Sequence, residues 1–178
     1  MTADATPGPD VVLGTERLRL RPWRVSDAAV LRELWAERDA RVPPHRRIDA
    51  DGRPTVQDLE DAIRTEPRWV HGLLAVERRA DHDVVGCCGL VDSDRGGPGE
   101  LEIAFELLRR TWGRGYATEA SAAVLDRARA VGHERIWATV WDWNAASLHV
   151  LAKLGFAETG EAEVDEVHGT TLVLVRPL

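Results

Sequence analysis

Cysteine is scarce in this 178-residue chain, and the only two, Cys87 and Cys88, are neighbours. Adjacent side chains of a strand point to opposite faces, so these thiols are not expected to form a structural disulfide. The six histidines are scattered, with no HxxxH pair and no spaced pair of cysteines. We therefore expect no protein metal site and a reducing, cytoplasmic environment.

Long apolar runs are absent as well. No stretch approaches the ~20 apolar residues that a membrane-spanning helix requires. Residues 1–10 have neither the basic nor the apolar region of a signal peptide. The sequence thus predicts no membrane association, a flexible tail over residues 1–12, and a single domain over residues 13–178.

Basic residues are not in excess, because the formal net charge is −7 at pH 7. A general nucleic-acid-binding domain carries a basic stripe, so we expect no nucleic-acid partner. Against this acidic background, Arg109, Arg110 and Arg114 stand close together. An acidic protein that binds an anion must do so through a local positive field of this kind.

Alternating and 3.6-residue apolar patterns divide the chain into strands and helices. They predict strands at residues 18–21, 69–77, 84–91, 100–107, 135–141, 156–164 and 170–176. They predict helices at residues 26–38, 55–66, 116–131 and 144–154. Strands 100–107 and 135–141 are joined through a helix and should be parallel neighbours, and Gly86 is a candidate bulge. The predicted fold class is α/β (α+β), with a mixed sheet.

The central feature is the junction between strand 100–107 and helix 116–131, where Gly113 and Gly115 stand two apart. Glycine lets the backbone turn tightly, and a helix start offers unpaired N–H groups and a positive dipole end. This arrangement predicts an anion site. A dinucleotide fingerprint would need a glycine where Thr118 stands, and the Gly-Lys-Ser/Thr of a P-loop is absent.

Two sequence blocks carry a family resemblance. Residues 112–120, WGRGYATEA, are followed by residues 144–156, NAASLHVLAKLGF. Both resemble the GNAT superfamily of N-acyltransferases, specifically its RimJ/RimL-type branch, and so does the opening TERLRLRP at residues 15–22. The family motif is Gln/Arg-x-x-Gly-x-Gly/Ala, and Trp112 departs from it by standing in the Gln/Arg place.

The resemblance covers roughly residues 15–176 and implies the fold and the cosubstrate. The GNAT fold has a mostly antiparallel sheet of six to seven strands, flanked by about four helices, with splayed central parallel strands. Acetyl-CoA is the implied cosubstrate, and no metal takes part. The pantetheine arm of acetyl-CoA would lie in the gap between the splayed strands. The pyrophosphate of acetyl-CoA would lie on the backbone N–H groups of the glycine turn.

The residues that match the family's cofactor site lie on strand 100–107, on the glycine turn and at the helix start near residue 144. With Trp112 in the motif, the positive charge is expected from Arg110 and Arg114. The implied cofactor-binding residues are Phe105, Glu106, Leu107, Arg110, Trp112, Gly113, Arg114, Gly115, Tyr116, Ala117, Thr118, Asn144 and Ser147.

Three residues are the implied catalytic candidates. Ser147 is placed in this branch to protonate the departing CoA thiolate, although a serine in the first turn of a helix is also ordinary. Glu102 and Glu166 are alternative bases for the attacking amine, and Glu106 is a third choice. Each carboxylate also fits a solvent-exposed role without chemistry.

The expected reaction is direct attack of a primary amine on acetyl-CoA in a ternary complex, because no motif surrounds the two cysteines. The branch favours the N-terminal α-amine of a protein or peptide. An α-amine has a pKa near 7.7–8.0, whereas a lysine amine near 10.4 costs roughly 3.5 kcal/mol more to deprotonate at neutral pH. Small-molecule amines such as antibiotics, polyamines or amino acids are the first alternative, and a non-catalytic acyl-CoA-binding module is the second. Loops 41–54 and 92–99 are the expected acceptor walls, and the chain is a monomer or a homodimer.

Overall fold

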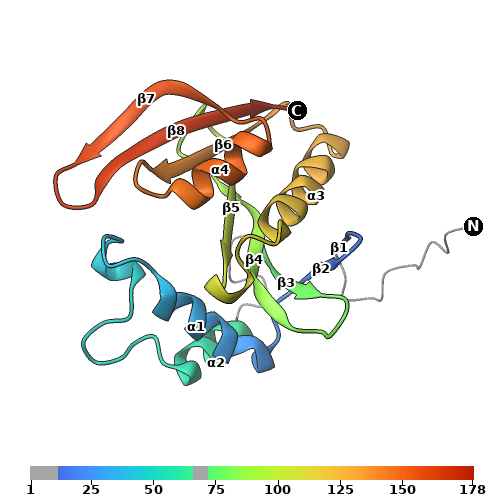
Figure 1. Cartoon of the computed structure of the whole chain (residues 1–178), viewed down its shortest axis with the longest axis vertical. Helices are drawn as coiled ribbons and strands as arrows, with labels where there is room; N and C mark the ends of the chain where they lie inside the picture. The colour runs from blue at the N-terminus through green and yellow to red at the C-terminus, as the bar shows by residue number, and fades with distance from the viewer. Residues whose placement is uncertain (1–11, 66–71) are drawn as a thin grey trace, which may run out of the picture.

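One sheet organises the protein, which a computed structural model describes over residues 12–65 and 72–178. Eight strands follow the order β1-β2-β3-β4-β5-β6-β8-β7 (Figure 1). They are β1 (Leu13–Gly14), β2 (Leu18–Arg21), β3 (Leu73–Arg78), β4 (Val84–Asp92), β5 (Leu101–Leu107), β6 (Arg135–Trp141), β7 (Ala157–Asp165) and β8 (Gly169–Pro177). All neighbours are antiparallel except β5 and β6.

The predicted mixed, mostly antiparallel sheet is confirmed. It has one strand more than the expected six to seven, because the two-residue strand β1 pairs with β2. The predicted strand 69–77 is found from Leu73 onward, while its first residues, 69–71, lie outside the described residues. Most of the expected tail, residues 1–11, lies outside them too.

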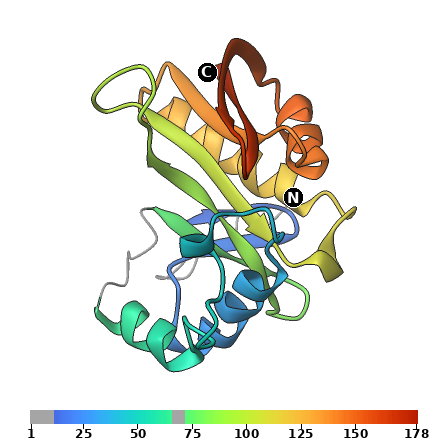
Figure 2. The ribbon, with the colours of Figure 1, turned by 90° about the vertical axis from the view of Figure 1, so that its left-hand side faces the viewer.

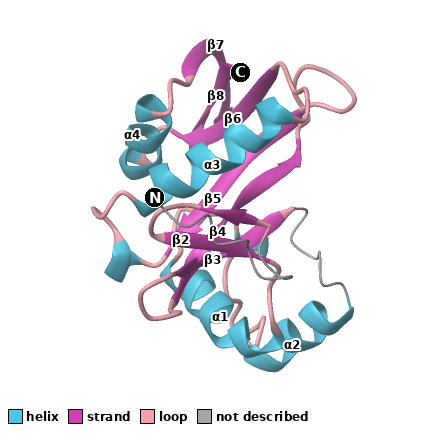
Figure 3. Cartoon of the chain, turned by 90° about the vertical axis from the view of Figure 1, so that its right-hand side faces the viewer, coloured by secondary structure: helices cyan, strands magenta, loops and turns pink. Residues whose placement is uncertain are grey.

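Four α-helices flank the sheet. They are α1 (Ala28–Glu37), α2 (Val56–Thr65), α3 (Tyr116–Ala130) and α4 (Ala145–Lys153), and the described residues add the short 3-10 helices η1 (Val25–Asp27), η2 (Pro44–Arg46) and η3 (Arg109–Thr111). Figure 3 shows α3 and α4 on one face of the sheet, and α1 and α2 pack on the opposite face (Figures 2 and 3).

Local capping explains where the helices begin and end. The Thr55 hydroxyl accepts from the Asp58 backbone N–H at 3.1 Å, and the Asp58 carboxylate accepts from the Thr55 N–H at 2.8 Å, which closes a reciprocal cap on α2. Asn144 caps α4 through its side-chain oxygen. Gly132, just past the end of α3, has a φ of 96°, a left-handed conformation that glycine adopts without strain.

Two apolar clusters fill the two faces of the sheet. The larger contains Cys88, Ile103, Val124 and Ile136 and joins the sheet to α3 and α4. The smaller joins α1 and α2 to β3 and β4 and contains Cys87. The adjacent cysteines therefore do face opposite sides, and both are free and buried.

The predicted bulge at Gly86 is confirmed. Val76 pairs with Gly86, but Glu77 pairs with Val84, so β4 carries one extra residue. A side chain at Gly86 would meet the Glu106 carbonyl oxygen at 2.2 Å, so only glycine fits this close approach of β4 to β5.

The parallel strands β5 and β6 separate almost at once. Their only ladder pair in the described residues joins Glu102 to Trp137. Beyond it, the strands diverge toward their C-terminal ends, which lead into the starts of α3 and α4 (Figure 1). The splay that the resemblance implies is therefore present, and it leaves one backbone edge of β5 without a strand partner.

Candidate active site

The glycine turn lies between β5 and α3. Gly113 and Gly115 have φ values of 74° and 79°, which other residues adopt only with strain. Gly115 is the residue before the first turn of α3 and receives no side-chain cap. Both glycines are therefore needed for the sharp entry into the helix.

The N–H groups of residues 113–118 are free to bind a ligand. Among the described residues, no hydrogen-bond acceptor engages them, and Glu119 is the first residue whose N–H reaches the Gly115 carbonyl, at 3.0 Å. Gly113 has no atom within 4 Å of the position where a Cβ would lie, so the turn is open. Free amides at the positive end of a 15-residue helix form an anion site.

The three arginines beside this turn differ in their partners, and the Arg109 guanidinium donates to the Glu37 carbonyl and lies 5.9 Å from the centre of the Trp112 ring. The Arg110 guanidinium binds the Asp83 carboxylate at 2.6 and 3.1 Å, and this hydrogen bonding lowers the pKa of Asp83. The Arg110 guanidinium thus already has a carboxylate partner, and its expected role in supplying charge to the ligand stays a prediction. The Arg114 side chain has no partner among the described residues, and its carbonyl is held by Arg17 Nη1 at 3.0 Å.

Trp112 makes a specific contact in the place of the family's Gln or Arg. Its indole Nε1–H donates to the Leu107 carbonyl at 2.7 Å, while 55% of the residue stays exposed. The indole therefore lies over the end of β5, where the pantetheine arm is expected. Of the three expected β5 residues, Leu107 has its carbonyl occupied in this state, and the backbones of Phe105 and Glu106 lie next to the splay.

The start of α4 offers two polar groups. Asn144 Oδ1 accepts from the Ser147 backbone N–H at 3.2 Å, which leaves the amide NH2 of Asn144 unused. The Ser147 hydroxyl has no hydrogen-bond partner in the part of the chain that the structure describes. α4 packs beside α3 (Figures 1 and 3). The two helix starts therefore lie on either side of the gap between β5 and β6.

Glu102 lies on the opposite face of the sheet from α3. Its Oε1 accepts from the Thr139 hydroxyl at 2.5 Å and from the Thr139 N–H at 3.2 Å, so the carboxylate bridges β5 and β6 where they part. It borders a cavity of about 290 Å³. The lining residues are Val91, Asp92, Asp94, Arg95, Glu102, Thr139, Glu163 and Thr171. Loop 92–99 is therefore a wall of this cavity.

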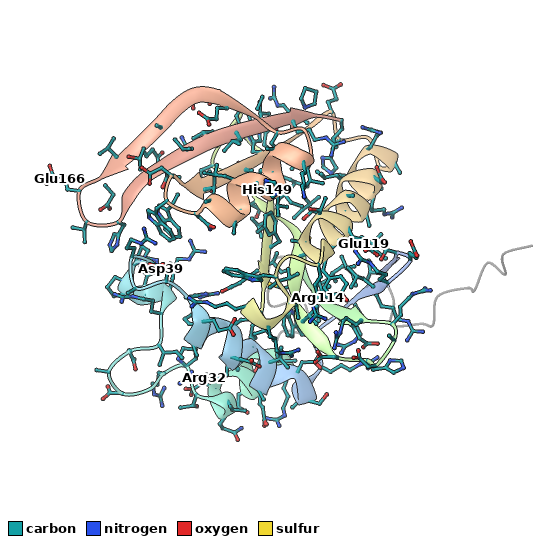
Figure 4. The ribbon with its side chains drawn as sticks, in the orientation of Figure 1. Arg32, Asp39, Arg114, Glu119, His149 and Glu166 are labelled. Atoms are coloured by element: carbon teal, nitrogen blue, oxygen red, sulfur yellow. The ribbon has the colours of Figure 1, made fainter. Side chains whose placement is uncertain are left out.

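The other two carboxylates are placed differently. Glu106 forms a two-point ion pair with Arg38, at 2.8 and 2.7 Å, so its charge is already balanced. Glu166 lies in the turn between β7 and β8, and Figure 4 shows it at the outer tip of this hairpin, away from His149 on α4. The turn itself contacts the residue before the α4 cap, because the Trp143 indole N–H donates to the His168 carbonyl at 2.8 Å.

The cysteines offer no nucleophile. Burial raises the pKa of both thiols, to about 12 for Cys88. Thiols in this state stay protonated at neutral pH and are inert. Among residues 12–65 and 72–178, no group of acidic, histidine or cysteine side chains is arranged to hold a metal ion. No helix in the same ranges is long and apolar enough to cross a membrane.

Several residues at this site were not found from the sequence. Thr139 holds Glu102, and Arg38 holds Glu106 and also donates to the Arg46 carbonyl at 2.8 Å. Trp141 and Trp143 stack at 5.2 Å beside loop 41–54. The only sequence signal was the alternation along strand 135–141, which puts Thr139 and Trp141 on one face.

The gap between β5 and β6, flanked by two helix starts with free polar groups, is the arrangement expected of an acyl-CoA-dependent transferase. The chain belongs to the acetyltransferase (GNAT) domain family, whose model matches residues 17–157. It is an acetyltransferase that uses acetyl-CoA.

Known proteins agree with this placement. An uncharacterized N-acetyltransferase, p20 of Bacillus licheniformis, is 29% identical over 155 residues, with 83% of each chain covered. A GNAT-family acetyltransferase from Bacillus anthracis superposes with a TM-score of 0.75 at 20% identity, over 93% of this chain and 97% of that one. RimJ of Mycobacterium smegmatis, solved with CoA-disulfide, superposes with a TM-score of 0.68 at 28% identity, over 90% of this chain and 81% of that one.

Proposed function

We propose that this protein is a RimJ/RimL-like enzyme that transfers acetyl from acetyl-CoA to a primary amine, foremost the N-terminal α-amine of a protein or peptide. The observation that carries the proposal is the row of unengaged N–H groups at residues 113–118, beside the splay of β5 and β6. A CoA pyrophosphate fits the amides and Arg114, and a pantetheine arm fits the free edge of β5.

Binding of the arm requires a movement of Trp112. Its indole N–H occupies the Leu107 carbonyl, and its exposed ring has space to turn outward. At the far end of the arm, the Asn144 amide and the Ser147 hydroxyl meet the thioester. A backbone N–H of β5 stabilises the negative charge that develops on the thioester oxygen.

The chemical step is a direct attack. The amine nitrogen bonds to the thioester carbon, the C–S bond breaks, and the thiolate takes a proton from the Ser147 hydroxyl, which regains one from solvent. The proton lost by the amine goes to Glu102, directly or through water. Glu102 is preferred over Glu106, which Arg38 neutralises, and over Glu166, which lies at the hairpin tip.

The test is an acceptor panel. Free thiol is followed after mixing the protein with acetyl-CoA and peptides with free or blocked N-termini, and with small amines such as a polyamine and an amino acid. We expect thiol release with free α-amines and none with N-blocked peptides. Release with polyamines alone would overturn the α-amine assignment, and tight CoA binding without release in any mixture would overturn the chemistry.

A further inference from the structure

The charges near Glu102 are mostly balanced. Arg38 pairs with Glu106 at 2.7 Å, and Arg41 pairs with Asp39 at 2.9 Å. Arg95, on the wall of the cavity, pairs with Glu163. These three arginines are therefore not available to a ligand without breaking an ion pair.

Arg46 differs from these three arginines. Its guanidinium lies 5.4 Å from the centre of the Trp141 ring, and no carboxylate of the described residues lies within ion-pair distance. Partial desolvation of the guanidinium, together with the charge of Arg38, lowers the pKa of Arg46, while Glu106 and Glu102 raise it. The positive charge of Arg46 is therefore only partly compensated, and it interacts electrostatically with Glu102 and Glu106 on β5.

The backbone of Arg46 is fixed although its side chain is exposed. The Arg46 carbonyl accepts from Arg38 Nη1 at 2.8 Å, and the Arg46 N–H donates to the Pro43 carbonyl at 2.9 Å. The loop is also tied to the β7–β8 turn, because His168 Nδ1 lies 2.8 Å from the Arg41 carbonyl. The Arg46 guanidinium therefore extends from a loop whose backbone is fixed by hydrogen bonds.

Trp141 connects Arg46 to the edge of the cavity. Trp141, on which its guanidinium lies, pairs with Thr171 of β8, and Thr171 lines the cavity that Glu102 borders. One edge of this region therefore carries the partly compensated charge of Arg46, and the cavity carries the carboxylates of Asp92, Asp94 and Glu102. An acceptor that binds both Glu102 and Arg46 has an amine beside Glu102 and an anionic group beside Arg46.

We propose that Arg46 binds a carboxylate of the acceptor, so that the preferred substrate is an α-amine with a carboxylate close by. A planar guanidinium backed by an aromatic ring is well suited to two-point carboxylate binding. The carboxylate belongs either to a free amino acid or to an acidic first residue of a peptide. This inference rests on the proposed function, because it takes Glu102 as the group beside the acceptor amine.

Two matched pairs of acceptors test the inference. One pair is alanine and alaninamide; the other is Asp-Ala-Ala-amide and Asn-Ala-Ala-amide. We expect kcat/KM to be about tenfold or more higher for the carboxylate member of at least one pair, which corresponds to one charge-assisted hydrogen-bonded contact. The pair that shows the preference identifies the source of the carboxylate.

Arg46→Gln should abolish this preference while leaving the rate with the amide members within about twofold, because only the anionic contact is removed. Arg53→Gln is the matched control: it makes the same charge change in the same loop, at an exposed residue whose guanidinium faces Asp58 at 3.5 Å, and it should keep the preference. No preference in either pair, or a preference that survives Arg46→Gln, overturns the inference.

Binding separates this inference from the proposed function. The same four acceptors are titrated into the CoA-loaded protein by calorimetry, which requires no turnover. Tighter binding of a carboxylate member that is lost in Arg46→Gln supports the inference even if no acetyl group is transferred. Transfer to the amides at the rates seen with the acids supports the proposed function and overturns the inference.

Discussion

Glu102 is held by a neutral residue rather than by a cation. Thr139 donates to it twice, so the carboxylate is oriented without an ion pair that a proton transfer would have to break. A base held in this way keeps its remaining lone pairs toward the cavity. The contrast with Glu106, which is locked by Arg38, separates two carboxylates that stand only four residues apart on β5.

The first prediction concerns this base. Glu102→Gln should lower kcat by about 10²-fold, since general bases contribute roughly that much. Glu166→Gln should leave kcat unchanged, because the residue lies at the hairpin tip. Steady-state rates at a fixed, saturating concentration of acetyl-CoA check both variants. A loss of kcat in Glu166→Gln and not in Glu102→Gln would exchange their roles.

Ser147 gives a prediction that separates chemistry from structure. The cap of α4 uses the Ser147 backbone N–H, which Ser147→Ala retains. This substitution should therefore lower kcat on the order of 10²-fold, by more than it weakens CoA binding, and leave the melting temperature unchanged. Asn144→Ala removes the cap and should cost about 1 kcal/mol of stability. Equal melting losses in both variants would make Ser147 structural.

At the scale of elements, substitutions in the turn that leads into α3 should impair CoA binding specifically. Gly115→Ala places a side chain at a φ of 79°, which costs about 1 kcal/mol. Gly115→Asp adds a negative charge beside the free amides. We expect Ala to weaken CoA binding modestly and Asp to abolish it, as measured by titration of CoA. Equal binding by the two variants would place the pyrophosphate elsewhere.

The elements themselves were largely readable from the sequence. Asn144, Thr55 and Gly132 mark helix ends through local bonds, and local bonds depend on nearby residues only. The splay was implied by the family resemblance of two sequence blocks, and the structure shows it. The arrangement of Arg38, Arg46 and Trp141 was not readable, because it joins a loop to strands far along the chain. The pairing of Arg110 with Asp83 was missed for the same reason, since residues 27 positions apart meet only through the sheet.

At the scale of the whole molecule, a buried ionic cluster links β2, β3 and the start of α1. Arg21 binds Glu77 at 2.6 Å and Asp27 at 2.7 Å, with all three residues almost fully buried. Burial raises the pKa of Glu77, but hydrogen bonds from Arg21 and His82 outweigh it, so this pKa lies below its usual value. A buried charge whose partner is removed is strongly destabilising.

The fourth prediction follows from this cluster. Glu77→Gln should lower the free energy of unfolding by about 3 kcal/mol at pH 7. Because the folded pKa of Glu77 is lowered, its contribution is present above the unfolded pKa of about 4.3 and is lost as the pH falls through the folded value. The difference between wild type and variant should therefore shrink in acid. Urea unfolding at pH 7 and pH 3.5 measures it.

A matched control is the exposed pair of Glu60 and Arg64 on α2. Glu60→Gln should not shift the urea midpoint measurably, because exposed ion pairs contribute little. A pH-independent difference between Glu77→Gln and wild type would contradict the assigned role of the Glu77 charge.

The two adjacent cysteines allow local unfolding on each face of the sheet to be measured by alkylation. Cys88 lies in the cluster under α3, and Cys87 in the cluster under α1 and α2. Neither thiol reacts with an alkylating reagent until the layer above it lifts. The order in which the two become labelled under native conditions therefore reveals which half of the sheet loosens first. A bound cosubstrate, which engages the start of α3, should slow the labelling of Cys88 more than that of Cys87.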